Sequence, residues 1–490
     1  MQTEEETLDP QNWDELRKLG HQMIDDMMGY LKSLRDNPAW RPVPEGVRRA
    51  IGGTLPTEPQ SYESVYNEFV DHVLPYPNGN IHPRFWGWVQ GTGTPFAMLA
   101  DMLASGLNPH MAGFEQAPAI VEETVMEWLK KLMGFPESAS GLLVSGCTMA
   151  NLTALMVARN QKAGVALREN GLQGTGSATL VAYASSEMHC WAQKAMDVLG
   201  LGSLNLRIIP VDEDYRLSKE ELAQSIHRDR ALGLQPFCIL ATAGTVNTGA
   251  IDNLDALADL AEQENLWFHI DGAFGALARL SPRHYHLLNG MERANSLAFD
   301  LHKWMYLPFE VGCVLIKDPA AHHKTFAQTA HYISAVGRGV MAGALQFSDL
   351  GIELTRGFKA LKVWMSLKAH GSLQLGRIIG QNIDQAQHLA KLIQNSPNLT
   401  LLAKVSLNVV CFRYHVPNLE ENLLTKLNQE ILIQLQEKGY AVPSATTLAG
   451  KFGLRVAIVN HRSIRSDFDF LVNKVEELGQ EILKNPPWEI

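Results

Sequence analysis

Short apolar runs alternate with amphipathic segments through the middle of this 490-residue chain, and this alternation constrains the fold more than any other feature. The apolar runs predict strands at residues 141–146, 179–184, 206–211, 237–244, 266–271, 296–300 and 312–318. The amphipathic segments predict helices at 148–160, 190–200, 219–233 and 253–265. Strands that alternate with helices indicate a largely parallel sheet covered by helices on both faces. Ligands bind such sheets at the carboxyl ends of the strands.

The segments on either side of this region follow other patterns. We expect residues 1–35 to be helical until the prolines of 36–46 end the helix, and 76–96 to form an ordered loop. An apolar stripe predicts a helix over 119–133 that ends at Gly134. Beyond about residue 370 a smaller α+β domain is expected, with helices at 374–396 and 466–485 and strands at 407–414 and 452–459.

Composition excludes several classes of function. The net charge is −10 and no run of lysine or arginine occurs, which argues against nucleic acid or an anionic membrane as the main partner. No window approaches the ~20 apolar residues of a membrane span, and the N-terminus is acidic and polar. The five cysteines are dispersed singly, without a CxxC pair, which is typical of reduced thiols in a cytoplasmic protein.

Four side chains that carry chemistry follow the predicted strands. Cys147 and Thr148 open a helix after the first strand, where backbone amides bind anions, although Thr148 is equally explained as a helix cap. His189 follows the second strand, and a single histidine there is more often structural. Asp271 ends the fifth strand, where a carboxylate either caps the next helix or faces a cationic ligand atom.

Lys303 lies in the otherwise apolar run 297–316, 32 residues after Asp271. A single lysine there would be expected to extend its amine into water. If the amine is buried instead, burial lowers its pKa and prepares it to form a Schiff base. An anion site, an imidazole, a carboxylate and an amine at successive strand ends match the phosphate, ring, ring nitrogen and aldehyde of pyridoxal 5′-phosphate.

At these residues the chain resembles the group II pyridoxal-phosphate-dependent amino-acid decarboxylases. The resemblance covers nearly the whole chain and is carried by HPRFWGW (82–88), EWLKKLMGFP (127–136), HIDGAF (269–274), LHKW (301–304), TRGFKALKVW (355–364) and the segment 452–480. It implies an α/β protein of fold type I (aspartate aminotransferase-like), with a mainly parallel seven-stranded sheet, helices on both faces and a small α+β C-terminal domain. It further implies an N-terminal helical arm for dimerisation (1–85), a large cofactor domain (86–370), a small domain (371–490), and a homodimer with shared active sites.

The resemblance also assigns roles to residues. Lys303 forms the Schiff base, Asp271 pairs with the pyridine nitrogen, and His189 stacks on the ring. The other cofactor contacts that it implies are Gly146, Cys147, Thr148 and His302 around the phosphate, Thr242 and Ala273 at the ring, and Thr355 from the neighbouring subunit. Tyr332 would return a proton to the substrate from a loop. The alternative interpretation of Tyr332 is an ordinary aromatic residue of a surface loop. The implied substrate contacts are Trp88, Phe114 and Arg455, and Arg455 is equally explained by a structural ion pair.

The implied reaction is decarboxylation of an L-amino acid to the amine and CO₂. Trp88 and Phe114 are large and apolar, and no extra arginine stands near them to hold a distal carboxylate, so an aromatic substrate is expected. The alternatives are an aldehyde synthase, which adds oxidative deamination, a decarboxylase of a non-aromatic amino acid, a transaminase, or a catalytically silent dimer. Tyr332 favours simple decarboxylation, and the intact Lys303, Asp271 and His189 argue against a silent protein.

Three positions depart from the family pattern. Asp300 stands where asparagine is frequent, Cys147 replaces a small residue, and Arg356 has lost an arginine neighbour. A carboxylate at 300 would repel a phosphate unless it bonds elsewhere, so its role is open. No metal is expected: His284, His286, His322 and His323 lack carboxylates at ligand spacing and are interpreted as solvated surface.

Overall fold

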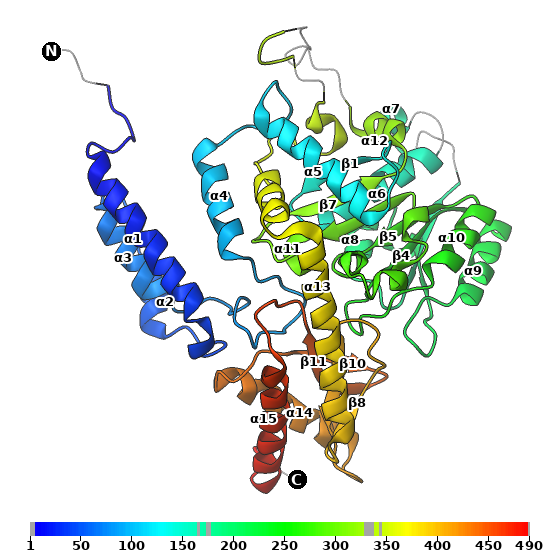
Figure 1. Ribbon diagram of the computed structural model, residues 1–490. Coiled ribbons are helices and arrows are strands. Elements are labelled where there is room, and N and C mark those ends of the chain that lie inside the picture. Colours follow the sequence, from blue (N-terminus) through cyan, green and yellow to red (C-terminus); the bar gives the residue numbers. More distant parts are fainter. Residues whose placement is uncertain (1–4, 164–166, 173–177, 328–337, 343–344, 489–490) are drawn as a thin grey trace.

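The computed structural model describes residues 5–163, 167–172, 178–327, 338–342 and 345–488. A seven-stranded sheet in the order β1-β7-β6-β5-β4-β2-β3 forms its centre (Figure 1). The strands are β1 Ser140–Val144, β2 Leu180–Ser185, β3 Leu206–Ile209, β4 Gln235–Thr242, β5 Trp267–Asp271, β6 Ser296–Asp300 and β7 Gly312–Ile316. Every predicted strand is confirmed, and the predicted and observed ends differ by two residues or fewer.

Strand direction in this sheet is mainly parallel, as predicted. β7 is antiparallel to both of its neighbours, β1 and β6. The pairs β6–β5, β5–β4, β4–β2 and β2–β3 are parallel. The carboxyl ends of β1, β2, β4, β5 and β6 therefore meet at one edge of the sheet, which is where ligands bind in such folds.

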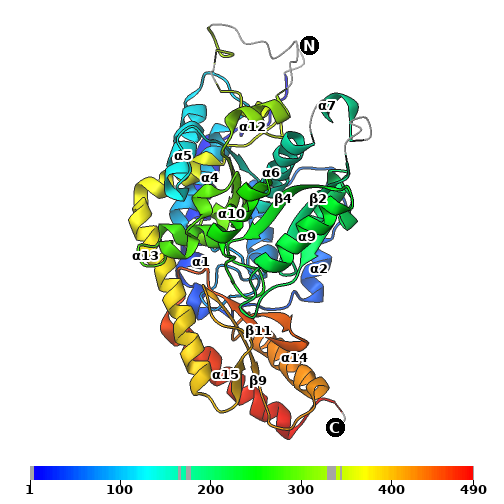
Figure 2. The same ribbon diagram turned by 90° about the vertical axis from the view of Figure 1, so that its right-hand side faces the viewer.

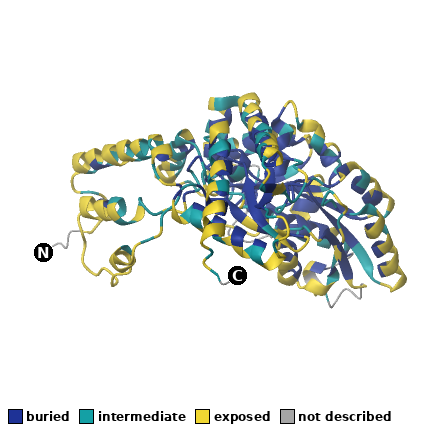
Figure 3. Ribbon diagram, turned by 90° about the horizontal axis from the view of Figure 1, so that it is seen from below, coloured by how far each residue is buried: buried dark blue, intermediate teal, exposed yellow. Residues whose placement is uncertain are grey.

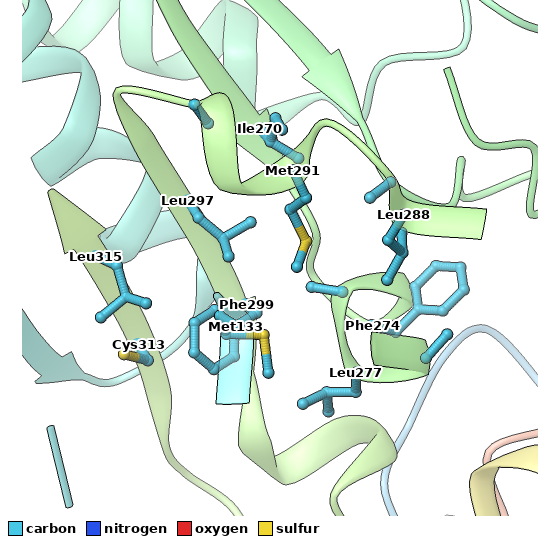
Figure 4. Close-up of a cluster of buried hydrophobic side chains, with 14 of the residues drawn as sticks. Met133, Ile270, Phe274, Leu277, Leu288, Met291, Leu297, Phe299, Cys313 and Leu315 are labelled. Carbon is cyan, nitrogen blue, oxygen red and sulfur yellow. The ribbon is translucent and has the colours of Figure 1, made fainter. Parts of the chain in front are cut away.

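Helices cover both faces of the sheet because the central strands are apolar on both sides. Leu297 and Phe299 of β6 and Cys313 and Leu315 of β7 point into one core, together with Ile270 of β5 (Figure 4). The alternate residues of the same strands belong to a second core on the opposite face. Helices α5 (Ala117–Met133), α9 (Lys219–Ala231) and α10 (Leu254–Gln263) cover the first face, and α6 (Cys147–Lys162) and α8 (Trp191–Val198) cover the second.

The N-terminal segment is helical over less of its length than predicted. Helix α1 spans Trp13–Lys32, and the side chain of Asn12 caps it by accepting from the amides of Asp14 and Glu15. The described residues before Asn12 are not helical, so the prediction for 1–35 was wrong there. Helices α2 (Glu45–Ile51) and α3 (Tyr62–Glu68) lie beside α1, and this arm stands apart from the rest of the chain with most of its surface exposed (Figures 1 and 3).

The C-terminal part packs around a second, antiparallel sheet. Its strand order is β10-β11-β9-β8, formed by β8 Leu399–Leu401, β9 Val409–Tyr414, β10 Ser444–Leu448 and β11 Lys451–Ala457. Helices α14 (Glu421–Glu437) and α15 (Arg465–Lys484) pack against it. Helix α13 (Ala360–Asn395) connects the large sheet region to this part and is interrupted at Gly371, whose φ of 68° is non-helical (Figure 2). The remaining helices are α4 (Pro95–Leu107), α7 (Leu167–Asn170), α11 (Leu301–Trp304) and α12 (Pro319–Phe326).

One histidine contradicts the prediction of solvated surface. His322 is fully buried, 2.7 Å from the hydroxyl of Ser140 and 2.7 Å from the carbonyl of Leu350, and burial lowers its pKa to about 4. It is a structural histidine that joins α12 to β1. Among the described residues, no His, Cys, Asp and Glu side chains are grouped so as to hold a metal, and no helix is long and apolar enough to cross a membrane.

Candidate active site

The carboxyl edge of the large sheet holds a cavity of about 440 Å³. Its floor is the start of α6: Gly146 precedes the helix, and Cys147, Thr148 and Met149 form its first turn. The amides of a first helical turn have no partner within the helix and carry a partial positive charge, so they bind anions. A Cβ on Gly146 would lie 3.6 Å from Cε1 of His302 and 3.7 Å from Oδ1 of Asp300, so the absence of a side chain keeps this corner open.

Asp271, the last residue of β5, lies in the cavity wall with its carboxylate held by three donors. The indole Nε1 of Trp191 donates to Oδ2 across 2.6 Å. The amide of Ala273 donates to Oδ1 at 3.0 Å, and the thiol of Cys147 lies 3.5 Å from the same oxygen. Burial first, and then the carboxylates of Asp271 and Asp300, raise the pKa of the Cys147 thiol, so the thiol stays neutral. The carboxylate of Asp271 is therefore fixed in one orientation beside the cavity.

Lys303 does not end a strand but lies in α11, the single turn that follows β6. Its Nζ is 2.9 Å from Oδ2 of Asp300, three residues earlier. Burial is the largest single influence and favours the neutral amine. Asp300, through its charge and its hydrogen bond, acts together with Cys147 and Asp271 to outweigh burial, so the pKa of Lys303 is raised. The prediction that this pKa falls was therefore wrong for the free amine of Lys303, because Asp300 supplies a buried counter-ion.

Both histidines of the cavity are neutral at pH 7. His189 is open to the cavity at the start of α8, and its pKa is lowered, chiefly by burial. Nδ1 of His302 lies 3.0 Å from the carbonyl oxygen and 3.2 Å from the amide nitrogen of Val311. Nε2 of the same ring lies 3.7 Å from Oδ2 of Asp300. Burial lowers the pKa of His302 as well.

Several residues that support the cavity were not predicted from the sequence. Asn151 of α6 accepts from Nε2 of His269 at 2.8 Å and donates to the sulfur of Cys147 at 3.5 Å. The carboxylate of Asp252 accepts from the amide of Thr242 at 2.7 Å and from that of Leu217 at 2.7 Å. These contacts join residues far apart in the chain, so no local pattern reveals them.

Gly91 was not predicted either. Its importance is that its backbone lies very close to the backbone of His302. A Cβ on this residue would lie 1.5 Å from the carbonyl oxygen of His302. The loop before α4 therefore packs directly against the backbone of α11, which carries Lys303. The signal in the sequence is the glycine-rich segment GTGTPF (91–96), whose packing partner only the structure identifies.

The cavity brings together most of the predicted site residues. Those that line it are Trp88, Gly146, Cys147, Thr148, His189, Thr242, Asp271, Ala273, His302 and Lys303. Phe114 and the exposed Thr355 are not among the described residues of its lining. Tyr332 falls outside the described residues.

Arg455 lies beside the cavity and is 3% exposed. Its Nη1 donates to the carbonyl of Trp88 at 2.9 Å, and its Nε donates to the carbonyl of Asn247 at 3.2 Å. Its Nη2 is buried without a hydrogen-bond partner among the described residues, and no carboxylate of those residues pairs with it. The ion pair weighed as an alternative is therefore not found in the described part of the chain, and burial lowers the pKa of Arg455 to about 10.

Arg356 is not among the described residues that line the cavity, and its contacts indicate a structural role. It forms a buried ion pair with Glu122 and donates to the carbonyls of Leu143 at 2.9 Å and Met111 at 2.8 Å. It therefore ties the segment before α13 to α5 and β1.

The cavity fits pyridoxal phosphate group by group. The open amides of α6 suit its phosphate, the fixed carboxylate of Asp271 suits a protonated ring nitrogen, and the amine of Lys303 suits its aldehyde. Ala273 and His189 line the space between them. Each of these groups is present in the wall of the same cavity.

Comparison with known proteins agrees with this geometry. The model of the pyridoxal-dependent decarboxylase conserved domain matches residues 44–415. An aromatic-L-amino-acid decarboxylase of Bacillus atrophaeus is 34% identical over 480 residues, covering 96% of each chain. A phenylacetaldehyde synthase of Petunia hybrida is 28% identical over 468 residues, covering 92% of this chain and 91% of its own.

A solved structure confirms the fold. The Oryza sativa TDC structure with PLP and tryptamine superposes with a TM-score of 0.89 at 24% identity, covering 97% of this chain and 100% of the other. The fold is that of fold type I, and the cofactor is pyridoxal 5′-phosphate. The chain belongs to the group II family of pyridoxal-phosphate-dependent amino-acid decarboxylases.

Proposed function

We propose that this protein removes CO₂ from an aromatic L-amino acid and releases the amine, with Lys303 as the residue that binds the cofactor covalently. The observation that carries the proposal is the convergence of the Lys303 amine, the Asp271 carboxylate and the start of α6 on one cavity. When bound, pyridoxal phosphate accepts into its ring the electron pair that departing CO₂ leaves on the substrate.

Asp271 would make this possible by holding the proton on the ring nitrogen. The donors Trp191 and Ala273 hold its carboxylate in one orientation. His189, neutral and open to the cavity, would lie against one face of the ring. Ala273, on the other side, leaves room for a flat ring.

Substrate orientation would depend on the region around Trp88. The partnerless Nη2 of Arg455, whose Nη1 bonds the Trp88 carbonyl, is the group that we assign to the substrate carboxylate. The lining also includes Val89, Val246 and Phe274, which suit an apolar side chain. The charged residues of the described lining include no arginine, and Glu310 would repel a distal carboxylate, which disfavours glutamate and aspartate.

After CO₂ leaves, a proton has to return to the substrate carbon. We assign this step to Tyr332 on the strength of the family resemblance, since this residue lies outside the described part of the chain. The phenylacetaldehyde synthase among the relatives supports a second candidate, decarboxylation with oxidative deamination to an aldehyde. A decarboxylase of a non-aromatic amino acid is the third, and the identity of the products separates all three.

The protein would act as a homodimer in the cytoplasm. Large apolar side chains are exposed on the arm and on α4: Trp13, Leu55, Tyr62, Val65, Met102, Leu103 and Leu107. Exposed apolar surface of this kind marks interfaces between proteins. The partner subunit's Thr355 would then reach the phosphate, because Thr355 is exposed and lies outside the cavity of its own chain. All five cysteines are free, as expected in a reducing compartment.

We also propose domain limits of 1–85 for the arm, 86–370 for the cofactor domain and 371–490 for the small domain. The interruption of α13 at Gly371 supports the second boundary. The dimer is tested by sedimentation of the holoenzyme and of Leu103→Glu, which should dissociate. Leu204→Glu places the same charge at an exposed leucine away from α4 and should remain dimeric.

The function is tested by a product assay on the purified, cofactor-loaded protein. L-Tyrosine, L-DOPA, L-phenylalanine, L-tryptophan, L-histidine, L-glutamate and L-aspartate are supplied separately, and amine, aldehyde and hydrogen peroxide are quantified together. Amine without peroxide from an aromatic substrate is expected, and Lys303→Ala should give none. Aldehyde with peroxide would replace the proposal by the synthase, and amine from a non-aromatic substrate alone would overturn the assignment of substrate.

A further inference from the structure

Asp300 is a buried carboxylate whose two oxygens have very different surroundings. Oδ2 forms the ion pair with Lys303 at 2.9 Å, and the Asp300 side chain is 3% exposed. Oδ1 is buried and has no hydrogen-bond partner among the described residues. A buried polar atom without a partner is costly, so an unpaired carboxylate oxygen at the edge of a ligand cavity indicates a missing ligand or proton.

The partnerless oxygen lies beside the start of α6. A Cβ on Gly312 would lie 2.7 Å from Cα of Gly146 and 2.9 Å from Oδ1 of Asp300, so these groups meet at one point. Gly146 precedes the helix turn that suits the phosphate of the cofactor. A phosphate bound there would therefore stand close to a carboxylate, and two buried like charges repel strongly.

Once Lys303 has reacted, no other titratable group that faces Asp300 in the described part of the chain compensates the charge of its carboxylate. His302 of α11 and His189, two residues before α8, are neutral, and the Cys147 thiol of α6 is neutral. Asp271 of β5 is a second carboxyl group and cannot supply a cation. Lys303 is thus the only cation in contact with Asp300 among the described residues.

Schiff-base formation would convert this ammonium into an iminium ion without releasing a proton, and the phenolate of the cofactor would then offset the charge that had compensated Asp300. The balanced step is R–NH₃⁺ + O=CH–R′ → R–NH⁺=CH–R′ + H₂O: a C=N bond forms, the C=O bond breaks, and the oxygen leaves as water. The one proton that stays on the nitrogen is shared with the neighbouring phenolate oxygen of the cofactor. Asp300 then loses its partner at the moment that a phosphate arrives.

We propose that Asp300 takes up one proton from solvent when pyridoxal phosphate binds, and faces the phosphate as a neutral acid. The free protein thus keeps a Lys303–Asp300 ion pair, and the holoenzyme replaces it with an imine and a protonated carboxyl group. Asp300 is a positioning residue that makes cofactor affinity depend on pH. This inference rests on the proposed role of Lys303.

Proton linkage gives the expected size of the effect. Binding that takes up one proton per site tightens about tenfold for each unit by which the pH falls, as long as Asp300 is ionised before binding and protonated after it. In Asp300→Asn the side chain keeps its shape, is always neutral and can donate to a phosphate. Its affinity for pyridoxal phosphate should lose this dependence on pH.

The test is calorimetric titration of the full-length apoprotein with pyridoxal phosphate in buffers of different ionisation enthalpy, which counts the protons exchanged per site. Wild type should take up about one proton more than Asp300→Asn. Equal counts would overturn the proposal, and so would a folded Asp300→Asn that does not bind the cofactor, because the neutral form is the one assigned to the holoenzyme.

A second ligand keeps the test decisive if Asp300→Asn does not fold. 4-Deoxypyridoxine 5′-phosphate has the ring and the phosphate but a methyl group in place of the aldehyde, so Lys303 stays an ammonium ion paired with Asp300. Wild type should take up about one proton less with this ligand than with pyridoxal phosphate, and equal uptake would contradict the proposal. Failure of the role of Lys303 is seen separately, as the absence of Schiff-base absorbance.

Discussion

Trp191 and Asp271 are joined by a 2.6 Å hydrogen bond from the indole N–H to the carboxylate, across 80 positions of the chain. Trp191 is the first residue of α8, and Asp271 is the last residue of β5. The bond leaves the carboxylate one orientation, toward the cavity that holds Lys303. The geometry on which the proposed chemistry depends is thus set by a residue that does not itself carry chemistry.

Trp191→Phe should therefore lower kcat about tenfold to a hundredfold, the usual loss when a partner that orients a functional group is removed. KM should change less than kcat, because the indole N–H is bonded to Asp271. The control is Trp267→Phe, which removes a buried indole N–H from the hydroxyl of Ser296 instead. Steady-state kinetics of the two variants decide: equal losses of kcat would mean that Trp191 only stabilises the fold.

Gly91→Ala should displace α11 and the lysine that it carries. The new Cβ would lie 1.5 Å from the carbonyl oxygen of His302, which backbone movement alone can relieve. Overpacking of this kind costs ~1–3 kcal/mol, and the displaced lysine should bind less cofactor. Cofactor content by absorbance and the denaturation midpoint measure both effects. Gly106→Ala in α4, where nothing lies within 4 Å, should lower neither value.

The Arg356–Glu122 pair predicts a large loss of stability when it is broken. Arg356→Met leaves a buried carboxylate without a partner, which should lower the free energy of unfolding by ~3–5 kcal/mol. Arg283→Met breaks the exposed pair with Asp384, whose arginine side chain is 59% exposed, and should cost ~1 kcal/mol or less. Urea denaturation compares them, and the double variant Glu122→Gln/Arg356→Met should recover part of the loss. Equal costs for Arg356→Met and Arg283→Met would contradict this prediction.

His269 predicts how stability depends on pH. Burial lowers its pKa to about 4, although Asp271 acts in the opposite direction. Between its unfolded pKa near 6.5 and its folded pKa the unfolded chain binds more protons, so the free energy of unfolding falls as the pH falls through this window. The loss from His269 amounts to ~3 kcal/mol at most.

His269→Gln should make this dependence shallower, as measured by urea midpoints at pH 7, 6 and 5. His227→Gln replaces an exposed histidine of α9 and serves as the control. An unchanged slope in His269→Gln would show that His269 binds the same number of protons in the folded and the unfolded protein, and would contradict the lowered pKa.

The sequence predicted strand positions well because the strands of the large sheet are short, mostly apolar runs separated by helical patterns. β10 was missed because Ser444–Leu448 is mostly polar and only alternate residues are buried. Lys303, Asp271 and the start of α6 were predictable because each lies at the end of a strand or within a few residues after it. The raised pKa of Lys303 was not predictable, because it depends on whether the carboxylate of Asp300 points toward the amine. The roles of Asn151 and Asp252 depend on tertiary contacts alone.

The position of the covalent bond to the cofactor tests the account most directly. The holoenzyme is reduced with borohydride, digested and analysed by mass spectrometry, which identifies the lysine that carries the phosphopyridoxyl group. The label is expected on Lys303 in the peptide that contains LHKW, and no label is expected on Lys362, a buried lysine of α13 paired with Asp101. A label on any lysine other than Lys303 would contradict the site, the proposed mechanism and the inference about Asp300 together.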